Sequence, residues 1–239
     1  MLDHVFLDTV SALGRALDET LLQRERHEDR LASDLLLGDL VWETSVSLPG
    51  DGTPSRVRAD LTLDWPTWSQ SAWRSWALGE PLEEPPEIGL EIVFRVQRLA
   101  SRPDPDALLA QFANHEPPGV ESFERSSVVA EEDLGSGEVA VEVAFEGAFR
   151  LADPDDGPRR DPFGPDGLSN LDTNGVATDE RPEAAEMGRA HLRAAEVAGQ
   201  RGSLSSAMST NLTALGRWVA STLVRLADLE VEFLPAEEP

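Results

Sequence analysis

The segment from Glu138 to Leu151 constrains the fold more than any other part of this 239-residue chain. Its side chains alternate between large apolar residues and small or charged ones, which is the period of a β-strand. One face carries Val139, Val141, Val143, Phe145, Phe149 and Leu151, and the other carries Ala140, Glu142, Ala144, Glu146, Ala148 and Arg150. The pattern predicts a sheet with one apolar face, and it indicates a scaffold rather than a chemistry.

Other segments alternate in the same way and predict further strands. They are Leu35–Leu48, Val57–Trp65, Ile88–Leu99 and, with a weaker pattern, Val120–Ala130. The first two flank the turn sequence Pro49–Pro54, which predicts an antiparallel hairpin.

Amphipathic helices are predicted at both ends of the chain. Apolar residues recur every three or four positions from Met1 to about Asp34, and again from Leu204 to Leu229. Asp104-Pro105 predicts the start of a short helix between strands. The expected fold class is α+β, a mainly antiparallel sheet of about four to six strands whose apolar face is covered by the long N- and C-terminal helices.

The chain divides into segments of different composition. Residues 1–151 are expected to form the sheet domain, with its N-terminal helix. Residues 152–181 are acidic and rich in glycine and proline, which predicts a loop or linker. Residues 182–239 are expected to form a helical segment that ends in a short strand. Its apolar positions Met208, Leu212, Leu215 and Val219 suit either a contact with another helix or a helix lying on its own sheet, and they are candidate interaction residues.

The charge balance is extreme, with 45 acidic against 20 basic residues and a formal net charge of −25. Every basic residue is an arginine, because lysine is absent. This composition resembles that of proteins from salt-in halophilic archaea, although a GC-rich bacterial gene would also favour arginine. In about 1 M salt the Debye length falls to about 3 Å, so the repulsion within such a surface is largely screened.

The same acidity excludes nucleic acid and anionic membranes as expected partners. Residues 1–22 lack the basic start and apolar middle of a signal peptide, and no apolar run reaches the length of a membrane span. We therefore expect a soluble protein of the cytoplasm, or of a particle assembled there, with protein partners or self-association.

Missing residue types exclude much catalytic chemistry. Without lysine, tyrosine and cysteine there is no Schiff-base or P-loop lysine, no phenol acid and no thiol nucleophile. The histidines, His4, His27, His115 and His191, lie far apart in the sequence. No enzymatic activity and no catalytic residue are expected.

Tryptophans are concentrated in one stretch, at Trp65, Trp68, Trp73 and Trp76. Such a cluster suits a packed core, a contact between subunits, or a platform on which sugars or apolar ligands stack. The stretch is therefore a candidate interaction site.

One loop offers oxygen ligands at alternate positions. Asn170, Asp172 and Asn174, followed by Gly175, resemble the start of an EF-hand-type calcium loop. The match fails at the twelfth position, where Arg181 stands in place of the bidentate glutamate. Ca²⁺ at these residues is a candidate, and no other cofactor is expected.

These observations favour a non-catalytic structural or assembly subunit of a larger complex, such as a particle, a tail-like machine or a scaffold, from a halophile. The alternatives are a ligand-binding module that uses the tryptophan cluster and a cation-dependent domain that uses the loop at Asn170–Gly175.

Overall fold

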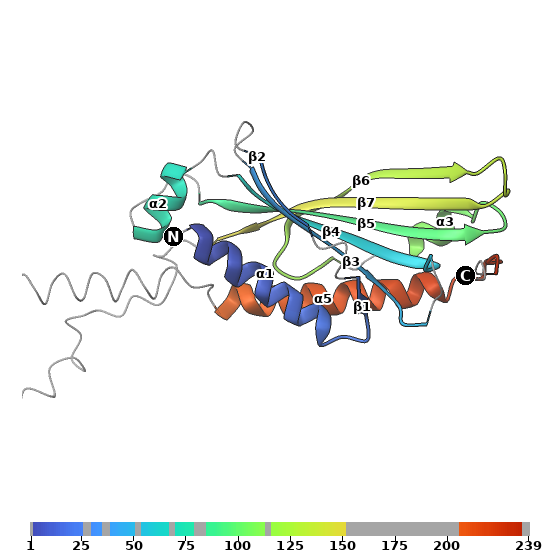
Figure 1. Ribbon diagram of the computed structural model, residues 1–239, viewed down its shortest axis with the longest axis horizontal. Helices are drawn as coiled ribbons and strands as arrows, with labels where there is room; N and C mark the ends of the chain where they lie inside the picture. Colours follow the sequence, from blue (N-terminus) through green and yellow to red (C-terminus); the bar gives the residue numbers. More distant parts are fainter. Residues whose placement is uncertain are drawn as a thin grey trace, which may run out of the picture.

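The computed structural model describes residues 2–25, 30–34, 39–50, 54–66, 70–78, 85–112, 116–151 and 206–235. They form an α+β fold with one antiparallel sheet and a helix near each end of the chain (Figure 1). The predicted class, an antiparallel sheet with terminal helices, is confirmed at this level.

The described helices are α1 (Leu2–Asp18), α2 (Gln70–Leu78), α3 (Pro105–Ala110) and α5 (Ser206–Ala227). The strands are β1 (Gln23–Arg24), β2 (Arg30–Asp34), β3 (Asp39–Ser47), β4 (Val57–Pro66), β5 (Glu87–Leu99), β6 (Glu121–Glu132) and β7 (Val139–Arg150). The seven-stranded sheet has the order β1-β3-β4-β5-β7-β6, and β2 pairs with β3 beside β1. The strands predicted within residues 1–151 are present in the described part of the chain, with β6 at one edge, whereas the short strand predicted near the C-terminus is a single bridge at Phe233.

The first helix is shorter than predicted. It ends at Asp18, so the expectation of helix to about Asp34 is wrong for residues 19–25 and 30–34. The Thr20 hydroxyl donates to the Leu17 carbonyl at 2.6 Å and accepts from the Leu22 N–H at 3.2 Å, which satisfies backbone groups at the helix end. Gln23–Arg24 and Arg30–Asp34 gain backbone hydrogen bonds by pairing with β3 instead.

The sheet has two different faces. The apolar face of β7 is buried, as are the inward positions of β4 and β5. They join the buried residues of α1 and α5 in one hydrophobic core. Phe6 of α1 packs edge-on against Trp65, with ring centroids 4.8 Å apart, and Trp218 of α5 packs against Phe94 at 5.5 Å. Figure 1 shows α1 and α5 lying side by side along the sheet.

Close approach of the two terminal helices depends on a small residue. A Cβ atom at Gly216 of α5 would lie 3.1 Å from backbone atoms of Ala16 in α1. Contacts this short are rare for a side chain, so glycine lets the helix backbones approach closely.

The end of β5 is tied to the C-terminal segment by Arg98. This buried residue has a left-handed φ of 61°, at the irregularity in the pairing of β5 with β7. Its N–H donates to the Glu138 carboxylate at 2.9 Å, and its guanidinium donates to the carbonyls of Pro54 and Leu234 at 3.2 and 2.7 Å. Leu99 also bridges to Phe233, so the segment that contains Phe233 and Leu234 is held against the sheet. None of the described helices is long and apolar enough to cross a membrane.

Candidate functional site

The face of the sheet opposite the core is polar. We call this surface the open face; its central residues are Thr62, Glu91, Arg95, Glu142 and Glu146. The strand registers place Glu43, Thr62, Glu91 and Glu146 in one row across β3, β4, β5 and β7. A band of carboxylates therefore crosses the middle of the open face.

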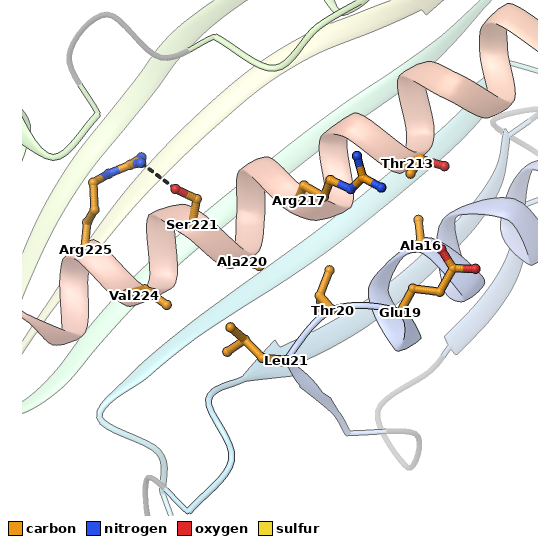
Figure 2. Close-up of a pocket in the computed structure, with 10 residues that line it drawn as sticks. All are labelled: Ala16, Glu19, Thr20, Leu21, Thr213, Arg217, Ala220, Ser221, Val224 and Arg225. Carbon is orange, nitrogen blue, oxygen red and sulfur yellow. Dashed lines mark hydrogen bonds between the residues drawn. The ribbon is translucent and has the colours of Figure 1, made fainter.

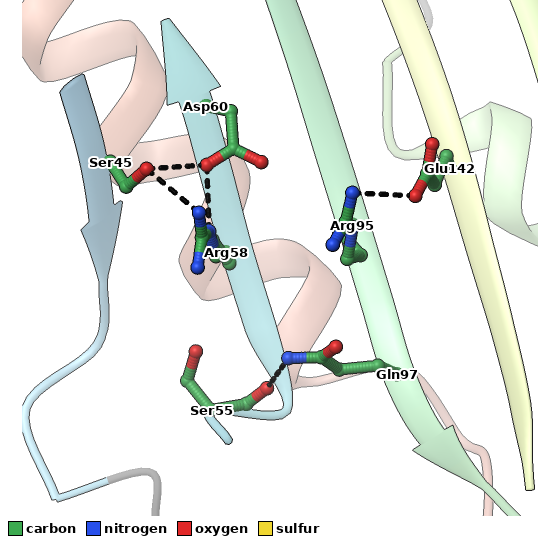
Figure 3. Close-up of polar contacts among 7 residues, drawn as sticks. All are labelled: Ser45, Ser55, Arg58, Asp60, Arg95, Gln97 and Glu142. Carbon is green, nitrogen blue, oxygen red and sulfur yellow. Dashed lines mark hydrogen bonds and ion pairs between the residues drawn. The ribbon is translucent and has the colours of Figure 1, made fainter. Parts of the chain in front are cut away.

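Carboxylates on the same strand or on a neighbouring strand hold the arginines of this face (Figure 3). The Arg58 guanidinium lies 2.6 Å from the Asp60 carboxylate and donates to the Ser45 hydroxyl at 2.9 Å. Arg95 lies 2.7 Å from a carboxylate oxygen of Glu142. Arg58 and Arg95 are partners in register, so each arginine is held by its own acid while the two cations lie next to each other.

Further polar contacts order both ends of this surface. The Gln97 side-chain amide donates to the Ser55 carbonyl at 2.5 Å (Figure 3). At the opposite end, Arg150 lies 2.9 Å from Glu87 and 3.4 Å from Glu121. The open face therefore presents charged groups in defined positions rather than a set of free side chains.

Glu91 lies where negative charge accumulates. Partial burial raises the pKa of its carboxyl above the ordinary value, and the charges of Glu146 and Glu43 raise it further. This environment therefore favours protonation of the Glu91 carboxyl, or the approach of a cationic group to it. A polar depression of about 460 Å³ opens beside it, lined on the open face by Arg30, Glu43, Ser45, Arg58, Asp60 and Thr62, with Thr44 and Leu61 completing its lining.

A second depression, of about 460 Å³, lies between the end of α1 and α5 (Figure 2). Its lining is formed by Ala16, Glu19, Thr20, Leu21, Thr213, Arg217, Ala220, Ser221, Val224 and Arg225. Arg225 donates to the Gln111 carbonyl at 3.0 Å and to the hydroxyls of Ser221 and Thr222 at 2.8 Å each, and partial burial lowers its pKa. Arg225 of α5 thereby contacts Gln111, the residue that caps the C-terminal end of α3.

The tryptophan cluster contributes mainly to the core. Trp65 is fully buried and Trp73 is 5% exposed. The Trp73 indole N–H donates to the Pro66 carbonyl at 3.1 Å, and its ring meets that of the half-buried Trp76 at 6.4 Å. Trp68 lies outside the described residues. The structure thus brings three of these tryptophans to one end of the sheet, and only Trp76 retains substantial exposure.

The structure describes the candidate residues of α5 but not those of the loop. Met208, Leu212, Leu215 and Val219 are buried where α5 joins the core. Asn170, Asp172 and Asn174 lie outside the described residues. Within the described ranges, no group of three or more histidines and acidic residues is arranged to hold a metal ion.

Sequence reasoning missed the ion-pair pattern of the open face. The alternation of Arg58, Asp60 and Thr62 identified their shared face, but local sequence does not reveal which strand lies alongside.

No family model matches the chain, and no curated protein or solved structure shows significant similarity to it.

Proposed function

We propose that the protein is a non-catalytic structural or assembly subunit of a larger complex, a particle, tail-like machine or scaffold of a halophile. In this proposal the long amphipathic helices α1 and α5 cover the apolar face of the sheet, and the open face docks against a neighbouring subunit. The observation that carries it is the set of ion-paired side chains on the open face, where no described helix is packed.

Preordered side chains favour this use. Binding costs the conformational freedom of every long side chain that it immobilises. On the open face Arg58 and Arg95 are already held by carboxylates and a hydroxyl, so docking would cost less entropy than it would at free arginines. Complementary charge then contributes specificity and speed of association more than raw affinity.

The charge pattern of the open face indicates which groups a partner surface would carry. A matching protein surface would place basic groups over the row of Glu43, Glu91 and Glu146, and acceptor groups near Arg58 and Arg95. Molar salt screens the long-range repulsion between acidic subunits but leaves direct contacts in place. Assembly at high salt is therefore compatible with a net charge of −25.

In this proposal the tryptophan cluster has a structural role. Trp65 and Trp73 fill the end of the sheet next to α1 and α2, where Trp65 packs against Phe6. Tryptophan fluorescence should then stay unchanged when glycans or lipids are titrated into the protein. A saturable change would favour the alternative of a ligand-binding module.

A substitution in the centre of the open face tests the proposal. Thr62→Arg adds a long cation between Glu43 and Glu91 without removing an ion pair, so we expect the fold to persist while docking is blocked. Ser71→Arg makes the same charge change at an exposed position of α2 and serves as the control. The readout is the mass of the native complex, measured by light scattering at native salt.

Light scattering should give the mass of a complex for the wild-type chain and for Ser71→Arg. For Thr62→Arg it should give a lower mass, that of the chain without its partner. Retention of Thr62→Arg in the complex would contradict docking through the open face. A wild-type chain that is strictly monomeric, with no co-purifying protein, would contradict the assembly function itself.

A further inference from the structure

The edge strand β6 has an unpaired side. It pairs with β7 alone among the described strands, and it lies along the upper right edge of the sheet in Figure 1. Most of its residues are exposed, including Val128 at 45% and Val129 at 44%. A long exposed edge presents a row of backbone donors and acceptors that can pair with another strand.

Only the first half of β6 is irregular. The pairing with β7 shifts between Glu121 and Glu124 and again between Arg125 and Ser127, whereas Ser127 to Glu132 run in continuous register. Bulges protect an edge against pairing, and so do proline and lysine. The regular half, Ser-Val-Val-Ala-Glu-Glu, contains no bulge, proline or lysine, and its charged residues, Glu131 and Glu132, stand together at its end.

The side chains of β6 are complementary to those of a second β6. Arg125 is the single basic residue of the strand, while Glu131 and Glu132 lie at its other end. Arg125 is opposite Phe145 and Glu132 is opposite Val139, so both lie on the core side of the sheet. An antiparallel arrangement of two copies brings Arg125 of each strand, which follows Glu124, to the acidic end of the other.

We propose that two copies of this chain join through their β6 edges, in antiparallel register centred on Val129, to make one continuous sheet. With Ser126 left unpaired, as it is at the irregularity of β6 between Arg125 and Ser127, this register keeps every facing pair on the same side of the sheet and sets Arg125 opposite Glu132. The other facing pairs are Val129 with Val129, Val128 with Ala130, and Ser127 with Glu131. A twofold axis through Val129 makes each unlike contact occur twice.

Each part of the register has a physical role. Backbone hydrogen bonds between the edges supply affinity, and the side chains set the register. Contact of Val129 with its copy removes two half-exposed apolar side chains from water. Glu124 comes opposite Asp133, a like-charged pair that opposes the contact; the Asp133 carboxylate is held within its own turn, where it accepts from the Gly135 N–H at 2.8 Å and the Ser136 hydroxyl at 3.0 Å.

This inference rests on the proposed assembly function and names one contact within it. The β6 edge and the open face are separate surfaces, because the edge uses backbone groups in the plane of the sheet. A pair joined at β6 would keep both open faces on the same side, available to other subunits.

Charge exchange between the two ends of β6 tests the proposal. Arg125→Glu places two carboxylates opposite each other at both ends of the contact, and Glu132→Arg does the same with arginines. We expect each variant to raise the dimer dissociation constant about tenfold or more, since opposed like charges destabilise strand pairs. The double variant Arg125→Glu/Glu132→Arg restores opposite charges and should recover the wild-type constant.

The measurement is sedimentation equilibrium of the purified chain in molar salt, with thermal unfolding recorded to verify the fold. Arg74→Glu on α2 makes the same charge change as Arg125→Glu at an exposed residue away from β6 and should leave the dimer intact. Monomeric wild-type protein, or a dimer that neither single variant weakens, would overturn the inference. If the chain still enters a larger complex in that case, the proposed function survives and only the β6 contact fails.

Discussion

Glu91 shows how a single side chain on the open face affects stability. Its folded-state pKa lies above that of the unfolded chain, so folding favours the protonated form and stability falls as pH rises from the acid range to neutrality. We expect Glu91→Gln to increase the free energy of unfolding at pH 7, by less than about 1 kcal/mol because the group is partly solvated.

Denaturant unfolding in molar salt at pH 7 and at pH 3 measures this effect. The gain from Glu91→Gln should disappear at pH 3, where wild-type Glu91 is also protonated. Glu116→Gln, in an exposed loop position, removes the same charge as a control. An equal gain in both variants, or a loss of stability in Glu91→Gln at pH 7, would contradict the role assigned to the carboxylate row.

At the scale of residues, sequence alternation predicted the burial of Val139, Val141 and Val143 and the polar character of the opposite face. It could not predict that Arg58 lies beside Arg95, because their strands are joined by a long connection that includes α2. The apolar period from Met1 to about Asp34 also included Leu21, which is 56% exposed because α1 ends at Asp18, before that residue.

At the scale of elements, the contact between α1 and α5 depends on Gly216. Alanine is about 1 kcal/mol better than glycine within a helix. At Gly216 the added methyl group would meet the Ala16 backbone at 3.1 Å, and overpacking costs about 1–3 kcal/mol. We therefore expect Gly216→Ala to lower the free energy of unfolding by about 1 kcal/mol.

Gly14→Ala is the matched control, since Gly14 also lies within a helix. There the nearest atom is the end of the Arg24 side chain, which can move. Denaturant unfolding should rank Gly14→Ala at or above the wild type and Gly216→Ala below it. A stabilised Gly216→Ala would show that the helices separate freely.

The apolar stripe of α5 illustrates why its neighbour was not predictable. Leu212, Leu215 and Val219 recur at spacings that suit a helix pair and a helix on a sheet equally. In the structure these residues are buried together with both α1 and the sheet. Truncation of Leu215 to alanine should cost about 2–5 kcal/mol in chemical denaturation, whereas Leu7→Ala, at a 55% exposed position of α1, should change stability little.

At the scale of the whole molecule, the net charge determines how stability should depend on salt. With −25 on 239 residues, compaction brings like charges together, and salt weakens their repulsion. The free energy of unfolding should rise when potassium chloride is raised from about 0.1 to 2 M. Urea denaturation across this series gives the test, and stability that stayed flat or fell would contradict a fold adapted to high salt.

The central claim is that this chain functions as a subunit bound to others, and the mass of the native species tests it most directly. Light scattering on the wild-type protein, isolated gently at native salt, should give a complex heavier than a pair of 26.0 kDa chains. Thr62→Arg should reduce that mass. A wild-type mass of 26.0 kDa at every concentration, without a co-purifying protein, would contradict the account.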